Sequence, residues 1–139
     1  MRLGKDAKVE VIRKVPLFSR LSTRRLREIA ALADEVDLPA GKVLAKEGDR
    51  GREFFALVDG EVEVEQGGRL VRRLKAGDFF GEIALVTKMP RTATVTATTD
   101  VRVLVITERD FGGLIKQTPE VGRGVAEALV ERLAPELPV

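Results

Sequence analysis

The chain has 139 residues, 44% hydrophobic and 33% charged, which is the composition of a soluble globular protein of one domain. It contains no cysteine and no histidine, which excludes disulfide bonds, Cys/His zinc sites and Ser-His-Asp or Cys-His catalysis. The net charge is only +2, but residues 1–30 hold nine basic and three acidic residues. Because these basic residues alternate with aliphatic ones at helical spacing, we interpret them as the solvated face of a helix rather than as a surface that binds nucleic acid or a membrane.

No segment has the pattern of a membrane span or a signal peptide. No apolar run reaches about 18 residues, and the first residues, Met1-Arg2-Leu3-Gly4-Lys5, lack an apolar core. We therefore expect a cytoplasmic protein without a membrane span.

The first 35 residues have the apolar spacing of helices, and we predict a helical lead-in over residues 5–35. Pro16 ends a first helix, and Ser22 is placed to N-cap a second. The apolar positions on the two buried faces are Val9, Ile12 and Val15, then Leu26, Ile29, Ala30 and Ala33.

In residues 36–106 the hydrophobic pattern changes to a period of two residues, interrupted by frequent turn signals. Glu61-Val62-Glu63-Val64-Glu65 alternates strictly, as a strand with one wet and one buried face does, and Thr92–Ala97 and Val101–Ile106 also predict strands. Turn signals recur about every ten residues, a spacing typical of an antiparallel sandwich or roll. They are Pro39-Ala40-Gly41, Gly48-Asp49, Asp59-Gly60, Gly67-Gly68 and Gly77-Asp78.

Residues 107–134 are predicted to form two C-terminal helices, the second opening at Thr118-Pro119-Glu120. Four glycines fall in this stretch, each disfavoured by roughly 1 kcal/mol against alanine inside a helix. We therefore expect these helices to depend on docking and to be candidates for a moving part. The glycines are Gly112, Gly113, Gly122 and Gly124, and the apolar stripe of the last helix is Val121, Val125, Leu129 and Leu133.

The segment from Asp78 to Val95 places a glutamate and an arginine in largely apolar surroundings, where charges need partners. On one interpretation Glu82 and Arg91 pair with each other and the segment is core packing. On the other, Gly81 lets the backbone approach a ligand, a short helical turn offers amides to an anion, Arg91 binds a phosphate as a fork, and Glu82 accepts hydrogen bonds from sugar hydroxyls. The chemistry alone favours neither.

The order of residues favours the second interpretation. Phe80-Gly81-Glu82-Ile83-Ala84-Leu85 followed by Pro90-Arg91-Thr92-Ala93 resembles the phosphate-binding cassette of the cyclic nucleotide-binding domain family, which includes catabolite activators and kinase regulatory subunits. Upstream segments also match that family: Gly48-Asp49, Phe54-Phe55-Ala56-Leu57, Gly60-Glu61-Val62 and Pro16-Leu17-Phe18. The resemblance covers residues 14–133.

The resemblance implies a single domain over residues 1–139: mainly β with flanking helices, an antiparallel, jelly-roll-like β roll with an N-terminal helical segment and two C-terminal helices. It implies a cAMP or cGMP sensor in which Arg91 binds the exocyclic phosphate and Glu82 the ribose 2′-hydroxyl, beside Gly81. Ile83 and Ala84 would offer backbone amides. The implied ligand site ends with Thr92, whose hydroxyl leaves cGMP open, and Ala93.

The family's signalling implies further roles for apolar residues. A hinge contact would join Leu85 or Val86 to Phe111; the alternative is that Phe111 is an ordinary core anchor. An aliphatic lid over the base would come from Leu133 or Leu137, near the helix-breaking Pro135.

The expected partners are the cyclic nucleotide and an unidentified effector protein or fused effector domain. We expect no DNA binding through a helix-turn-helix module, because the sequence ends at Val139 without room for one, and the apolar stripe of the last helix allows a homodimer. We expect no enzyme activity, metal or cofactor, since metal-dependent cupin-type enzymes need histidine ligands. The alternative function is a degenerate β roll that binds proteins and no nucleotide.

Overall fold

The computed structural model describes residues 2–86 and 90–133, and it divides into two compact units. The helical unit consists of residues 2–32 and 110–133, and the β unit of residues 33–109. That the whole chain is one domain stays a prediction. No helix among the described residues is long and apolar enough to cross a membrane.

The helices follow the sequence pattern closely. Pro16 opens a short 3₁₀ helix, and the Ser22 hydroxyl accepts a hydrogen bond from the Arg25 amide at 3.3 Å, which confirms the predicted N-cap. The positions predicted to face inward are buried, among them Ile12 and Ile29 with no exposed surface. The helices are α1 (Lys5–Arg13), η1 (Pro16–Phe18), α2 (Thr23–Leu32), α3 (Glu108–Gln117) and α4 (Pro119–Leu133).

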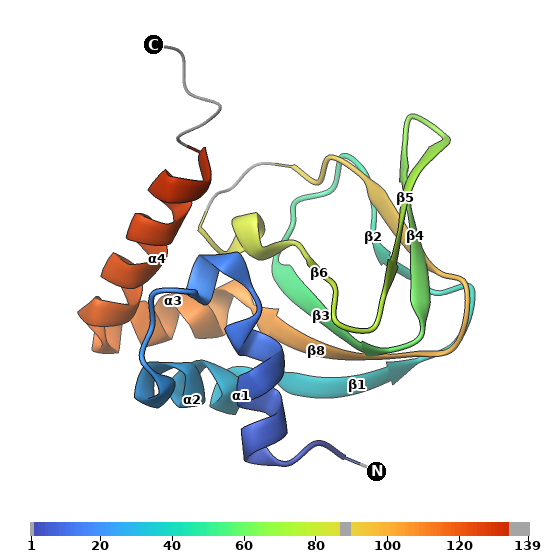
Figure 1. Ribbon diagram of the computed structural model, residues 1–139. Helices are drawn as coiled ribbons and strands as arrows, with labels where there is room; N and C mark the ends of the chain where they lie inside the picture. The colour runs from blue at the N-terminus through green and yellow to red at the C-terminus, as the bar shows by residue number, and fades with distance from the viewer. Residues whose placement is uncertain (1, 87–89, 134–139) are drawn as a thin grey trace. The chain divides into compact units, whose positions relative to one another are not determined.

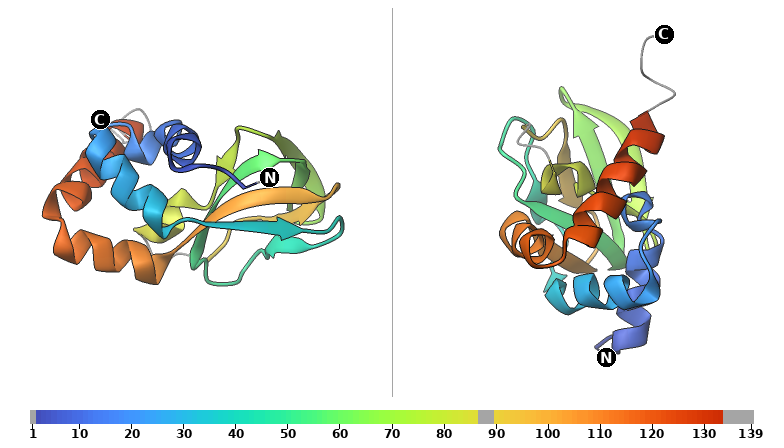
Figure 2. Two further views of the ribbon diagram at one scale, coloured as in Figure 1. Left: turned by 90° about the horizontal axis from the view of Figure 1, so that it is seen from below. Right: turned by 90° about the vertical axis from the view of Figure 1, so that its left-hand side faces the viewer.

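The C-terminal helices α3 and α4 are separate rods that meet at a sharp bend (Figure 2), and α4 runs through its two glycines without a break. A Cβ atom on Gly124 would lie 2.6 Å from Leu21 Cδ2, and one on Gly122 would lie 3.0 Å from Ile115 Cγ2. These glycines therefore permit close packing inside the helical unit. The two glycines lower the helix propensity of α4, and these packing contacts offset that loss of stability. The sequence pattern does not reveal the contacts.

The β unit consists of two four-stranded antiparallel sheets in the orders β1-β8-β3-β6 and β2-β7-β4-β5 (Figure 1). Together with the N-terminal helical segment and the two C-terminal helices, they confirm the predicted fold class, an antiparallel β roll. The strands are β1 (Asp34–Leu38), β2 (Val43–Ala45), β3 (Glu53–Asp59), β4 (Glu61–Gln66), β5 (Arg69–Lys75), β6 (Phe79–Phe80), β7 (Thr94–Ala97) and β8 (Val101–Thr107).

The core of the β unit lies between the inward faces of these strands. Val62 of β4 is fully buried while Glu61 before it is exposed, as the predicted alternation requires, whereas Glu63, Val64 and Glu65 are all half-buried. The predicted turns all carry glycines with positive φ, which other residues rarely adopt. The main buried core residues are Phe55, Leu57, Val62, Leu74, Val95, Ala97, Val101 and Val103.

Candidate functional site

The site segment begins where β6 leaves the sheet beside β3. Phe80 pairs with Phe55 and Phe79 with Ala56, and the rings of Phe55 and Phe80 stack with centroids 4.8 Å apart. This pairing sets where the chain departs from the sheet, so the next residue, Gly81, lies against the start of β3.

Gly81 adopts φ +83°, in the left-handed region that favours glycine. A Cβ atom here would lie 2.5 Å from Arg91 Nη1 and 2.8 Å from the carbonyl oxygen of Glu53. The Arg91 guanidinium therefore lies directly on the Gly81 backbone. The sequence predicted that Gly81 allows a close approach, and in the structure the group that approaches is the arginine.

Arg91 is held by the backbone on both sides. Its amide donates to the Asp49 carbonyl at 2.7 Å, the Gly48 amide donates to the Arg91 carbonyl at 2.9 Å, and Nη2 of the side chain donates to the Glu53 carbonyl at 2.5 Å. These bonds tie Arg91 to the turn before β3 and to β3 itself, so the guanidinium has a defined position.

The electrostatic setting of Arg91 is that of a cation partly removed from water. Burial lowers the pKa of Arg91, and the negative charge of Glu53 acts in the opposite direction to raise it. Over residues 2–86 and 90–133 we find no ion pair of this guanidinium with a carboxylate. A half-buried arginine that forms no ion pair in the described chain is suited to bind an anion.

Glu82 opens the 3₁₀ helix η2 (Glu82–Leu85), and only 5% of its surface is exposed. Ile83 and Ala84 lie in the first turn of η2. Hydrogen bonds in a 3₁₀ helix run from residue i+3 back to residue i, so the Ile83 amide lacks an acceptor within the helix, whereas the Ala84 amide is in position to donate to the Gly81 carbonyl. A buried carboxylate and the first-turn amide of Ile83 thus follow Gly81 directly, on the segment that contacts Arg91. The arrangement suits a ligand with both an anionic group and hydroxyls.

Thr92 and Ala93 follow the arginine, Thr92 exposed and Ala93 half-buried. The carbonyl of Thr92 accepts a hydrogen bond from Gln66 Nε2 at 3.1 Å, and the Glu47 carboxylate accepts one from the Gly67 amide at 3.0 Å. The Gln66 bond therefore ties the end of β4 to the arginine segment, and the Glu47 bond ties the turn after β4 to the segment before β3. The sequence predicted neither contact.

The predicted hinge residues fall in both units. Leu85 is buried and Val86 is exposed in the β unit, while Phe111 is fully buried in the helical unit, its ring 5.7 Å from that of Phe18. A contact of Leu85 or Val86 with Phe111 would join the units, and it stays a prediction.

The predicted base lid falls at the end of the described chain. Leu133 ends α4, and its side chain, like all of Leu137, lies outside the described residues.

Sequence reasoning missed the residues that position Arg91. Asp49 and Glu53 both act through backbone carbonyls, which every residue has, so no side-chain pattern marks them. The one available signal was the match of Gly48-Asp49 to the family pattern, which carried no role for either residue.

The family model for the cyclic nucleotide-binding domain matches residues 35–118, a range that contains the whole segment from Gly81 to Ala93. The chain belongs to the cyclic nucleotide-binding domain family. This confirms the resemblance inferred from the cassette motif.

Relatives of this cyclic nucleotide-binding domain include larger proteins. A cyclic nucleotide-gated potassium channel of Rhizobium etli is 37% identical over 123 residues, 88% of this chain and 34% of the channel. A cAMP-dependent protein kinase regulatory subunit of Mycosarcoma maydis is 42% identical over 110 residues, 73% of this chain and 21% of the subunit. The chain thus spans about a third or less of the length of these relatives.

Among solved structures, the N-terminal domain of a transcriptional regulator from Streptomyces coelicolor superimposes with a TM-score of 0.83 at 30% identity. The match covers 91% of this chain and 94% of that domain. The β roll with its N-terminal and C-terminal helices is therefore the fold of the family.

Proposed function

We propose that this domain binds one molecule of cAMP or cGMP and acts as the sensor of a cytoplasmic regulatory protein. The observation that carries the proposal is Arg91, a half-buried guanidinium without a carboxylate ion pair in the described chain, lying on the backbone of Gly81. A cyclic phosphodiester supplies the single negative charge that such a cation lacks.

In this proposal Arg91 binds the exocyclic phosphate oxygens and the amides of Ile83 and Ala84 support them, because forked guanidinium groups and first-turn amides both prefer oxyanions. Glu82 accepts hydrogen bonds from the ribose 2′-hydroxyl. Thr92 is exposed beside the arginine, where its hydroxyl can accept from the guanine amino group of cGMP. No metal or cofactor is part of this binding.

Calorimetric titration of the purified protein with cAMP and with cGMP tests the proposal. We expect saturable binding at one site per chain for at least one of the two nucleotides. The second candidate function, a degenerate β roll that only contacts proteins, predicts no heat of binding with either. No turnover of the nucleotide is expected, because the proposed site binds without catalysis.

Replacing Glu82 with alanine is expected to weaken cAMP binding less than loss of Arg91 does, because a neutral hydroxyl contributes less than a charged phosphate. The 2′-deoxy analogue of cAMP should bind the wild-type protein more weakly, yet bind the Glu82→Ala variant about as well as cAMP itself. Calorimetry of the four combinations measures this coupling. Additive losses would show that Glu82 is not the ribose partner.

We further propose that nucleotide binding repositions α3 and α4 through a hinge contact of Leu85 or Val86 with Phe111, and that Leu133 or Leu137 covers the base. Two conformations separated by a few kcal/mol would suffice for such a switch. The measurement is the distance between spin labels at Lys75 and Lys116, both on exposed surface. We expect this distance to change at saturating cAMP and the change to be lost in Phe111→Ala; a constant distance contradicts the switch.

An effector would receive this signal. The channel and the kinase regulatory subunit among the relatives suggest an effector domain on the same chain or a separate effector protein, and a homodimer through α4 remains part of the proposal.

A further inference from the structure

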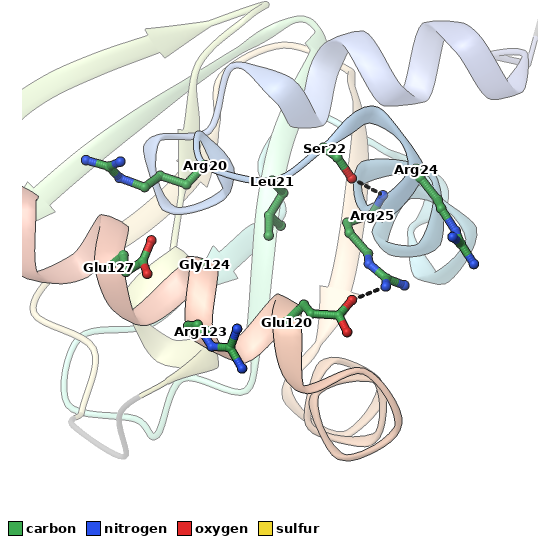
Figure 3. Close-up of a pocket in the computed structure, with 9 residues that line it drawn as sticks. All are labelled: Arg20, Leu21, Ser22, Arg24, Arg25, Glu120, Arg123, Gly124 and Glu127. Carbon is green, nitrogen blue, oxygen red and sulfur yellow. Dashed lines mark hydrogen bonds and ion pairs between the residues drawn. The ribbon is translucent and has the colours of Figure 1, made fainter.

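A cavity of about 390 Å³ lies within the helical unit, between residues 20–25, which include the first turn of α2, and the first turns of α4 (Figure 3). Leu21 packs onto Gly124 between the two walls, which holds them together. The residues lining the cavity are Arg20, Leu21, Ser22, Arg24, Arg25, Glu120, Arg123, Gly124 and Glu127.

Two of the four lining arginines are neutralised by ion pairs. Arg25 pairs with Glu28 at 2.8 Å and also with Glu120 across the cavity, and Arg20 pairs with Glu131 of α4. These pairs join the two walls, so their charges serve the internal structure of the helical unit.

The other two arginines, Arg24 and Arg123, are exposed and form no ion pair with any residue in the described parts of the chain. Arg24 comes from the α2 wall and Arg123 from the α4 wall (Figure 3). Both side chains lie in solvent, so each offers its charge to an anionic group of a partner.

We propose that this cavity is a docking site for an acidic segment of a partner protein, whose carboxylates bind Arg24 and Arg123. Arginine forms bidentate hydrogen bonds with carboxylates and is enriched in protein interfaces. The excess of six positive charges in residues 1–30 attracts such a segment at long range.

The lining favours a protein segment over a nucleic acid. Glu120 and Glu127 lie in the same cavity as the two free arginines, and Glu127 has no ion pair within the described chain. A phosphodiester backbone with evenly spaced charges would bring phosphates against these carboxylates, whereas a peptide can place separate carboxylates on the arginines and a neutral or basic residue beside Glu127.

The test is a titration of ¹⁵N-labelled protein with a short synthetic peptide of glutamate and serine at low ionic strength, followed by the Nε–H signals of the arginines. We expect saturable shifts of the Arg24 and Arg123 signals. The double variant Arg24→Gln/Arg123→Gln should bind the peptide about tenfold or more weakly, because two charge-assisted contacts are lost. Thermal unfolding should be unchanged, since both side chains are exposed.

The matched control is Arg69→Gln/Arg73→Gln, which removes the same charge from the exposed strand β5 and should leave peptide affinity unaltered. An equal loss of affinity in this control would show that the effect is general charge attraction, and it would overturn the proposal. The proposal would also be overturned by Arg24 and Arg123 signals that do not shift, or by a single-stranded oligonucleotide of the same charge that binds more tightly at these two residues. The cAMP titration of the Arg24/Arg123 variant should match wild type, which separates this site from the nucleotide site.

Discussion

The Arg91→Leu variant is expected to lose roughly 2–5 kcal/mol of cAMP binding free energy, the range measured when one partner of a desolvated charge pair is removed. The half-buried guanidinium is the charge that we assign to the phosphate, and burial strengthens its attraction to an anion. Isothermal titration calorimetry measures the loss.

Arg91→Lys is the informative companion, because it keeps the charge and removes the fork. Its affinity should fall between wild type and Arg91→Leu, while lysine can still reach toward the Glu53 carbonyl that Arg91 now contacts. If Arg91→Leu folds normally and binds cAMP as tightly as wild type, the phosphate binds elsewhere on the molecule.

The Gly81→Ala variant is expected to lose both stability and cAMP affinity. Alanine at φ +83° is strained, and its Cβ atom would meet Arg91 Nη1 and the Glu53 carbonyl at 2.5 and 2.8 Å. Together the backbone strain and the overpacking should lower the free energy of unfolding by about 2–4 kcal/mol. Affinity should fall as well, because the clash displaces the guanidinium. Denaturant unfolding and calorimetry measure the two effects.

Gly77→Ala is the matched control for this variant. Gly77 has φ +96°, but a Cβ atom there would have no neighbour within 4 Å. It should therefore show the backbone strain alone, about 1–2 kcal/mol, with unchanged cAMP affinity. Equal affinity losses in both variants would contradict a specific role for the contact between Gly81 and Arg91.

The elements of the fold were predictable where side chains repeat with a period. The alternation around Val62 and the aliphatic spacing of α2 indicate which face of each element is buried, because exposing an apolar side chain to water is unfavourable. The glycines of α4 show the limit of that reasoning. Propensity alone marks Gly124 as a weakness, whereas its contact with Leu21 depends on a residue about one hundred positions away.

For the candidate site, the order of residue types from Gly81 to Arg91 was enough to indicate the family. The roles of these residues toward a ligand follow from the resemblance and stay a prediction. The order of residue types did not indicate what orients Arg91. That depends on the carbonyls of Asp49 and Glu53, atoms common to all residues, whose positions follow from strand pairing.

By itself the amino-acid order determined the periodic elements, the family and the chemical groups available to a ligand, because those follow from side-chain types at short spacing. Only the tertiary structure decided that Arg91 lies against Gly81. It also decided that four arginines, from α2, the segment before it and α4, line one cavity, two of them without ion pairs in the described chain. Such contacts join residues far apart in the chain, and their geometry is set by backbone pairing and packing.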